Sequence, residues 1–177
     1  MLHIDEWTDF EAHDITELAL SVSDEIYGSV EEGMRELNLL DEWLDEQIEE
    51  GTCDEVRQQL LQGFYHSLGF HGDWQDYFSA NNCDLNQVLV QRKGIPVSLG
   101  ILIIQLGRKL GLDVEGICFP GHFLVSFAGG EGEVYVDPFT GDELSLARIE
   151  LLLRGALGDL ATLTPDYLQP SGQWEII

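Results

Sequence analysis

The sequence is poor in basic side chains. Its 177 residues contain 8 Lys and Arg against 33 Asp and Glu, which gives a formal net charge of −25 at pH 7. The first 80 residues hold 21 of the acidic residues but only Arg35 and Arg57. Such a surface repels phosphate backbones, so we expect no nucleic-acid partner. Two interpretations stay open: a strongly solvated surface, or a docking face for a partner protein with a basic surface.

Long apolar runs are also missing. The longest apolar region, Ile95–Leu106, is interrupted by Ser98 and Gln105, so no segment is apolar enough to span a bilayer. The first six residues lack the basic start and the apolar stretch of a signal peptide. We therefore expect a cytoplasmic protein with no membrane partner.

Cysteine is scarce, and its spacing excludes two kinds of site. Cys53, Cys83 and Cys118 are widely separated and form no Cys-x-x-Cys pair, so neither a zinc site nor thioredoxin-type chemistry is indicated. Free thiols fit a reducing compartment. The histidines at 3, 13, 66, 71 and 122 lack ligand spacing, and we expect neither a metal nor another cofactor.

Residues 1–80 have the periodicity of helices, and we interpret them as a helical subregion. Capping-box pairs at Ser29/Glu32 and Thr52/Glu55 are predicted to open the second and third helices. The apolar stripes of the three helices favour core packing over a cofactor surface, and they consist of Ile15, Leu18, Ala19, Val22 and Ile26, then Val30, Met34, Leu37 and Leu44, then Val56, Leu60, Phe64 and Leu68.

The middle of the chain, residues 81–145, is predicted to contain a central helix and a small sheet. Pro96 is suited to the first position of a helix, and Gly111 to the residue after its end. A loop should precede this region at Gly69–Asn82, followed by a short helix near Leu85. After Gly111 the period changes to two, which predicts strands at residues 114–119, 122–127 and 133–137.

The last segment, residues 146–177, is interpreted as C-terminal helices. Ser145 is a suitable N-cap for a helix through Leu153, and Pro165 could open another. The whole chain, residues 1–177, is thus predicted to be a single α+β domain with a helical N-terminal region packed on one central helix and a small antiparallel sheet.

The last two strands bring a histidine and an aspartate together in a hypothetical hairpin register. A loop centred between Gly129 and Gly130 would place His122 opposite Asp137, and the apolar pairs Phe123/Val136 and Val125/Val134 on the other face. Directly opposed residues have Cβ atoms about 4.5–5.5 Å apart, within reach of a hydrogen bond. The pair is two-thirds of a nucleophile–base–orienter arrangement. The alternative interpretation is a structural pair that joins two strands.

A nucleophile is missing from the expected position. A helix start lowers the pKa of a thiol and favours an oxyanion, but the helix that opens at Pro96 offers only Ser98 as a candidate. Ser98 is more typical of a first-turn residue that satisfies backbone groups. Cys118 precedes His122 on a strand and is interpreted as a small buried hydrophobe.

Several motifs occur together in an order that resembles the bacterial SirB-type family of the transglutaminase-like superfamily. They are Leu-Gly-Phe-His-Gly at 68–72, Asp-Tyr-Phe at 76–78, Leu-Asn-Gln-Val-Leu at 85–89, Arg-Lys-Gly-Ile-Pro-Val-Ser-Leu at 92–99, Gly116, Phe-Pro-Gly-His-Phe-Leu-Val at 119–125 and Val-Asp-Pro-Phe at 136–139. The resemblance covers residues 63–142 continuously. Members of this family often continue into a helical tetratricopeptide-like region.

The resemblance implies a papain-like core in which a cysteine opens the central helix, and histidine and aspartate follow on adjacent strands. His122 and Asp137 match that pattern, whereas Pro96 stands in the cysteine position. Ser98 would lie two residues further on, about 200° around the helix. Asn86, Pro96 and Cys118 are candidates for lining the site.

These observations give three functional hypotheses. The first is a binding or regulatory module, a possible pseudoenzyme that has lost its catalytic cysteine and takes a protein partner. The second is a hydrolase or acyl-transferase that uses Ser98 or a displaced cysteine, with His122 as base and Asp137 as orienter. The third gives His122 and Asp137 a purely structural role in the hairpin.

Overall fold

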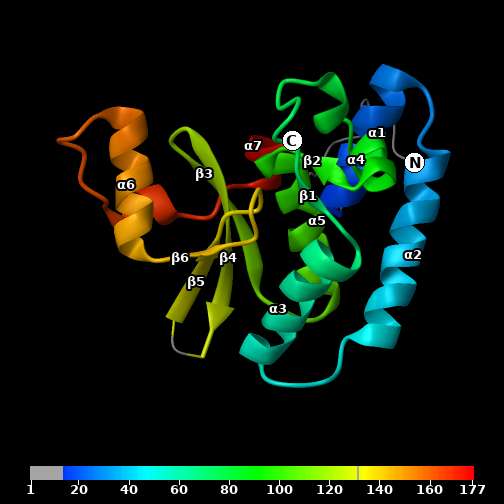
Figure 1. Cartoon of the computed structure of the whole chain (residues 1–177), viewed down its shortest axis with the longest axis horizontal. Helices are drawn as coiled ribbons and strands as arrows, with labels where there is room; N and C mark the ends of the chain where they lie inside the picture. Colours follow the sequence, from blue (N-terminus) through cyan, green and yellow to red (C-terminus); the bar gives the residue numbers. More distant parts are fainter. Residues whose placement is uncertain (1–13, 131) are drawn as a thin grey trace.

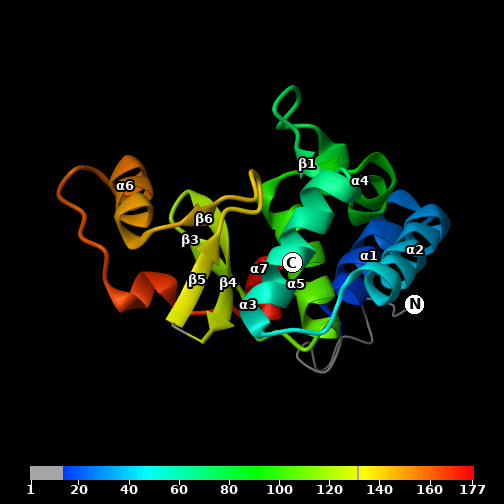
Figure 2. The same cartoon turned by 60° about the horizontal axis from the view of Figure 1, so that its bottom comes forward.

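The structure, a computed structural model, describes residues 14–130 and 132–177 as layers on both faces of one antiparallel sheet (Figure 1). The four strands run in the order β3 (Val114–Phe119), β4 (His122–Gly129), β5 (Gly132–Val136), β6 (Glu143–Leu144). Helix α5 (Pro96–Lys109) covers one face and α6 (Leu146–Leu157) the other, an arrangement that Figure 2 shows from a second direction. The mixed α+β fold with a transglutaminase-like core is as predicted.

The helices of the N-terminal half pack against α5 and against one another (Figure 1). They are α1 (Ile15–Tyr27), α2 (Glu31–Gln47), α3 (Cys53–Gln62) and α4 (Leu85–Gln91). The capping box at the start of α3 is confirmed, because Thr52 Oγ1 accepts a hydrogen bond from Glu55 N–H and the Glu55 carboxylate accepts one from Thr52 N–H.

The predicted cap of α2 was wrong. Its N-cap is Val30, whose side chain makes no capping hydrogen bond, so Ser29 lies one residue too early. The buried stripe of α2 runs through Gly33, Leu40 and Leu44, while Met34 is exposed. Helix α1 also turns the side chain of Ile26 out of its predicted stripe into solvent.

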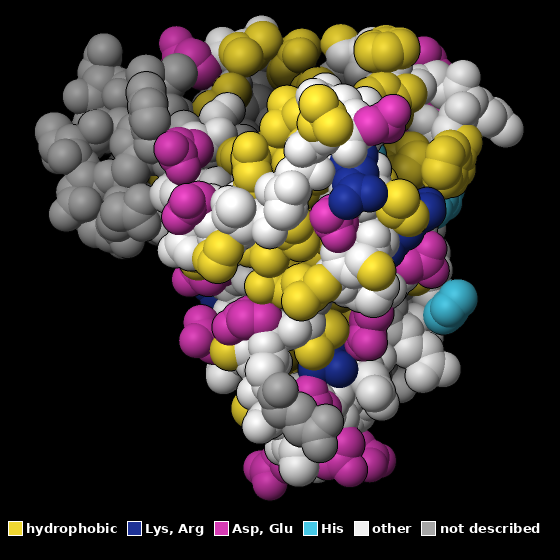
Figure 3. Space-filling view, turned by 90° about the vertical axis from the view of Figure 1, so that its left-hand side faces the viewer, with side chains coloured by type: hydrophobic (Ala, Val, Ile, Leu, Met, Phe, Trp, Pro, Cys, Tyr) yellow, Lys and Arg dark blue, Asp and Glu magenta, His cyan; other side chains and the backbone are white. Residues whose placement is uncertain are grey.

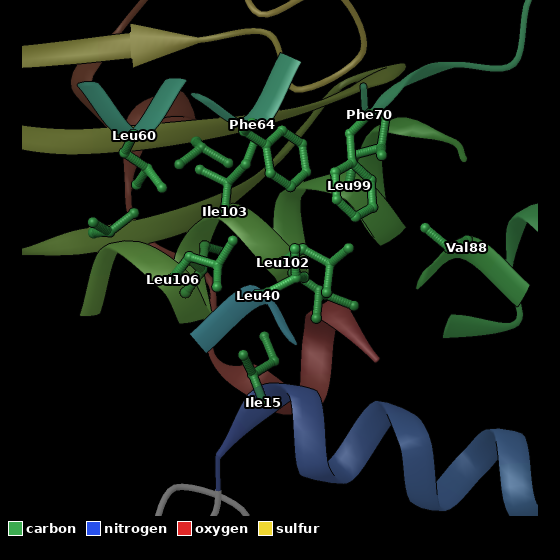
Figure 4. Packing of buried hydrophobic residues seen from close by; sticks show 14 of the residues in the cluster. Ile15, Leu40, Leu60, Phe64, Phe70, Val88, Leu99, Leu102, Ile103 and Leu106 are labelled. Carbon is green, nitrogen blue, oxygen red and sulfur yellow. The ribbon is translucent and has the colours of Figure 1, made fainter. Parts of the chain in front are cut away.

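Helix α5 is the centre of the main core (Figure 4). Pro96 is its first residue, as predicted, and every residue from Ser98 to Gly107 is buried. Gly111 follows the helix with a φ of +76°, a conformation that favours glycine. Burial of a leucine or isoleucine side chain contributes about 1.5–3 kcal/mol, and α5 supplies several: Leu99, Leu102, Ile103, Ile104 and Leu106.

The sheet is buried on both faces, which fits its position between two helical layers. Alternate residues point in opposite directions along a strand. The side chains packed with α5 include Val114, Phe123, Val125, Phe127 and Val136. A smaller second core lies under α6 and contains Ile117, Phe119, Leu124, Ile149 and Leu153.

The shortest elements were not predicted. Strands β1 (His71–Gly72) and β2 (Lys93–Gly94) form a parallel pair of two residues each, and the four-residue helix α7 (Gln173–Ile176) packs near β3. Two-residue strands are too short to show an alternating pattern. The remaining turns are a π-helical extension of α3 at Gly63–Ser67 and 3₁₀ turns at Ala80–Asn82 and Pro165–Leu168.

Candidate functional site

The start of α5 forms the base of the candidate site. Pro96 occupies the first helical position, and Ile95 precedes it in an extended conformation. The Ser98 hydroxyl donates to the Ile95 carbonyl oxygen and accepts from the Ile95 N–H, both at 3.1 Å. Ser98 is only 4% exposed and faces an apolar hollow beside Ala19 and Ile101. Its oxygen therefore closes the first turn of α5, and the structure does not bring it to His122.

The turn between β3 and β4 supplies the histidine. Phe119 pairs with His122 across the turn Pro120-Gly121, and Gly121 has a φ of +71°. Proline followed by a positive-φ glycine suits a tight turn of this kind. The turn exposes the His122 imidazole at the end of the sheet.

The predicted register between β4 and β5 was wrong by two residues. Val125 pairs with Val136, and Gly129 pairs with Gly132 at the end of the hairpin. A shift of two keeps every side chain on its predicted face, so the apolar pattern could not detect it. The two-residue connection, common in hairpins, decides the register instead.

The corrected register makes His122 and Asp137 diagonal neighbours rather than direct partners. If the pairing continued beyond Val136, Asp137 would lie opposite Leu124. Within the described residues no hydrogen bond joins the imidazole to the carboxylate. The Asp137 Oδ1 atom instead accepts from the Phe139 N–H at 2.8 Å.

Asp137 lies at the end of β5 in a tight, partly buried turn. Burial raises the pKa of its carboxyl group, while the Phe139 N–H and the charge of His122 act in the opposite direction. Beside it, the Tyr65 hydroxyl donates to the Pro138 carbonyl oxygen at 2.7 Å. Burial raises the pKa of Tyr65, and the Asp137 carboxylate raises it further, so the phenol stays protonated.

The start of α5, the β3–β4 turn and the residues after β5 line a cleft of about 690 Å³, which we call the end cleft. Pro96, Cys118, His122 and Asp137 all line it. This volume is within the range typical of ligand-binding sites. The structure therefore brings together four of the six predicted site residues, although they come from three separate segments of the chain.

The outer wall of the end cleft is aromatic, and the sequence analysis missed it as part of the site. Phe139 packs edge-on against Trp74 and Tyr77, with ring centroids 4.4 and 5.7 Å away. The Phe139 ring packs directly on the backbone of Gly72. A Cβ atom at position 72 would come within 2.5 Å of the ring, so this packing requires glycine. The available signal was the number of aromatic residues in the predicted loop at Gly69–Asn82.

An ion pair holds the loop that carries Trp74. Lys93 Nζ donates to Asp73 Oδ2 at 2.8 Å, and Asp73 Oδ1 accepts from the Asp76 N–H at 3.0 Å. The hydrogen bond from Lys93 lowers the pKa of Asp73 to about 2. The loop is thus tied to strand β2, directly before the start of α5.

Cys118 is exposed, which contradicts its interpretation as a buried hydrophobe. It pairs with Phe123 on the α5 side of the sheet, where its backbone N–H donates to Ser171 Oγ at 3.0 Å. Its Sγ atom lies 3.6 Å from the Glu175 carbonyl oxygen, the distance of a weak S–H hydrogen bond. Cys118 lies beside α7 and lines the end cleft.

Asn86, the remaining candidate, does not line the end cleft. Its Oδ1 atom accepts from the Gly33 N–H at 2.7 Å and joins α4 to α2. A Cβ atom on Gly33 would approach that oxygen to 2.6 Å, so the contact depends on glycine. Across residues 14–130 and 132–177, no three His, Cys, Asp or Glu side chains are grouped as metal ligands.

A comparison of the whole sequence with known families identifies the chain's superfamily. The profile of the Transglutaminase-like superfamily matches residues 21–177. The chain belongs to this superfamily. None of the described helices has the length and hydropathy needed to cross a bilayer.

Its relatives in the superfamily include bacterial and mammalian proteins. A UPF0162 protein of Vibrio cholerae is 45% identical over 113 residues, which are 63% of this chain and 42% of the relative. A UPF0162 protein of Pasteurella multocida is 41% identical over 62% of this chain and 41% of its own length. F-box only protein 21 of Homo sapiens is 35% identical over 56% of this chain and 18% of its own length.

The chain spans about two fifths of the length of the bacterial relatives that it matches. No solved structure matches it.

Proposed function

We propose that this transglutaminase-like protein is of the SirB type and acts in the cytoplasm as a binding or regulatory module rather than an acyl-transferase. The observation that carries the proposal is Pro96 at the first position of α5. The family resemblance places the catalytic cysteine there, and proline has no nucleophile. Ser98, the nearest hydroxyl, is buried and bonded to Ile95, which disfavours it as a replacement.

The chemistry of the end cleft favours a protein segment as its ligand. Trp74 and Tyr77 are exposed aromatic side chains beside the partly buried carboxyl group of Asp137. Exposed aromatic residues are enriched at protein interfaces. A net charge of −25 favours a partner with a basic surface. We infer that an apolar or aromatic side chain of the partner packs against Phe139 while a basic side chain lies near Asp137.

The test is recovery of a saturable protein partner by the purified chain. Trp74→Ala removes an exposed ring from the cleft wall and should weaken binding at least about tenfold, a loss of about 1.4 kcal/mol. Phe78→Ala is the matched control, because Phe78 is 94% exposed in the same loop and does not line the cleft. Equal binding by the two variants, or only salt-sensitive binding without stoichiometry, would contradict the proposal.

A hydrolase or acyl-transferase that uses Cys118 is the second candidate function. It is favoured by one observation, the exposed thiol in the same cleft as His122. In this mechanism His122 takes the thiol proton while Cys118 Sγ bonds to an acyl carbon. The leaving amine departs with that proton, and water or a second amine then releases the acyl group from sulfur.

Iodoacetamide labelling separates the two functions. A catalytic Cys118 should label faster than Cys53 and Cys83, and His122→Ala should slow that labelling about tenfold or more. Labelling of Cys118 that His122→Ala leaves unchanged would eliminate the enzyme and leave the binding module. Cys53 and Cys83 are matched internal controls because both are also free and exposed.

A further inference from the structure

A second hollow, of about 660 Å³, lies on the outer face of the sheet, and we call it the outer groove. Its floor is formed by two rows of paired residues that cross β3, β4 and β5. One row is Glu115, Ser126 and Tyr135, and the other is Asp113, Ala128 and Glu133. The outer groove therefore lies on the face opposite α5 and shares no lining residue with the end cleft.

Two hydroxyl groups on this floor have no partner in the described part of the chain. Ser126 is 6% exposed, yet its hydroxyl makes no hydrogen bond to any described residue. The same holds for the Tyr135 hydroxyl in the neighbouring strand. The Ser126 side chain is enclosed and Tyr135 is half-buried, and both line the groove. The hydroxyl groups of Ser126 and Tyr135 can therefore donate hydrogen bonds to a ligand in the groove or accept them from it.

The carboxylates on the floor are unequal in their partners. Glu115 is paired with Arg108 at 2.7 Å, whereas Asp113 and Glu133 form no ion pair with any described residue. Those two lie on either side of Ala128, two strand spacings apart, so their backbones are about 10 Å from each other. The Ala128 methyl group thus lies between two carboxylates that have no ion-pair partner among the described residues. A ligand that is apolar in the middle and cationic at both ends would match this arrangement.

The wall of the outer groove is apolar. It is built by Leu146 at the start of α6, and by Leu163 and Leu168 from the segment after it. On this side of the molecule, hydrophobic side chains gather over α6 and the segment that follows, with acidic side chains around them (Figure 3). The wall is therefore suited to methylene groups of a ligand rather than to water.

We propose that the outer groove binds a small linear aliphatic diamine. One ammonium group pairs with Asp113 and the other with Glu133, while the methylene chain crosses Ala128 and packs on Leu163. The hydroxyl groups of Ser126 and Tyr135 accept hydrogen bonds from the ammonium nearer to them. This ligand compensates both free carboxylates at once, which a monoamine cannot do.

Titration calorimetry of the full chain with a series of α,ω-diamines, from propane- to octane-diamine, tests this site. The affinity should be greatest for chains of about six or seven carbons, whose extended length matches the spacing of about 10 Å between the two strand positions. Hexylamine, which has one ammonium group, should bind about tenfold more weakly than hexane-diamine. An affinity that does not depend on chain length would identify non-specific counterion binding and overturn the proposal.

Single substitutions test whether the diamine binds in the outer groove. Glu133→Gln should weaken hexane-diamine at least about tenfold, and Ser126→Ala about threefold or more, with the urea midpoint checked for both. Glu25→Gln is the control for charge, because Glu25 is an exposed residue of α1. Equal effects of Glu133→Gln and Glu25→Gln would overturn the site. Tighter binding of a lysine-rich peptide, lost in Glu133→Gln, would overturn the small diamine as its ligand.

Discussion

The end cleft and the outer groove belong to the same sheet and have similar volumes, about 690 and 660 Å³, but different origins. The end cleft is formed where elements stop: the first turn of α5, the β3–β4 turn and the residues after β5. Most of the outer groove floor comes from the regular interior of three strands. The family motifs contain most of the residues that line the end cleft, whereas most of the residues that line the outer groove lie outside those motifs.

This difference means that the two hollows are positioned by different parts of the fold. Residues at element ends are positioned by turn geometry, as His122 is by Pro120-Gly121. Outward side chains in the middle of a strand can change without disturbing the pairing. Substitutions in the end cleft are therefore expected to act on turns, and those on the floor of the outer groove to act on outward side chains alone.

The largest effect should come from the core that supports both hollows. Leu102 is fully buried in α5, so Leu102→Ala should lower the free energy of unfolding by about 2–5 kcal/mol. Urea denaturation measures this change, and Leu151→Ala is the control because Leu151 is exposed on α6. Ligands of both hollows should raise the midpoint of the variant, because each binds the folded state, and a ligand that leaves the midpoint unchanged does not bind.

A change beneath Phe139 should affect the end cleft alone. Gly72→Val would force a side chain into the Phe139 ring, since even a Cβ atom would lie 2.5 Å from it. The expected cost is about 1–3 kcal/mol in denaturation experiments, together with weaker partner binding at the end cleft. Binding of hexane-diamine at the outer groove should be unchanged.

The matched control is Gly155→Ala, because a Cβ atom on Gly155 of α6 would meet nothing within 4 Å. This variant should be as stable as the parent chain or slightly more stable. A comparable loss of stability in both variants would show that Phe139 does not decide the effect.

Asp73 should give a smaller effect that depends on pH. Its pKa is about 2 in the folded chain, below the ordinary value of about 3.9 for an unfolded aspartate. Between these two pH values the unfolded state therefore binds more protons than the folded state. The stability that this group contributes is fully present above about pH 4 and is lost as the pH falls to about 2. Asp73→Asn should flatten this part of the curve in urea denaturation at stepped pH. An unchanged slope would contradict the role of Lys93.

Asp137 should give the smallest effect, with the opposite sign. Burial raises its folded-state pKa, so the stability from this group is present below the unfolded pKa and is lost as pH rises through the folded one. Asp137→Asn should remove that loss, because an asparagine oxygen can still accept from the Phe139 N–H. Carbon-13 NMR titration of Asp137 measures the pKa directly. A titration below the ordinary aspartate value would contradict this account.

Much of the core could be predicted from local patterns. Pro96, Gly111 and the change of period after it located α5 and three of the four sheet strands, because proline, glycine and alternation each restrict the backbone directly. Ser145 likewise caps α6, through a hydrogen bond from the Arg148 N–H. Signals of this kind act within a few residues of the chain.

Other features escaped prediction because their causes are distant in sequence. Trp74 and Phe139 lie 65 positions apart by their numbers and meet only because β1 joins β2 beside the end of the sheet. The exposure of Cys118 depends on how α7 packs against β3. Alternation along a strand describes neither contact.

The sequence by itself determined the central helix, the three longer strands of the sheet, the face on which each of their residues lies, and the proline at the start of α5. Each follows from short-range sterics and from a period that a local window can count. Only the tertiary structure decided that His122 and Asp137 are diagonal, that Ser98 turns away from them, and that a second hollow lies on the outer face. The physical reason is that a shift of two residues leaves the pattern of a strand unchanged, while it changes which side chains meet.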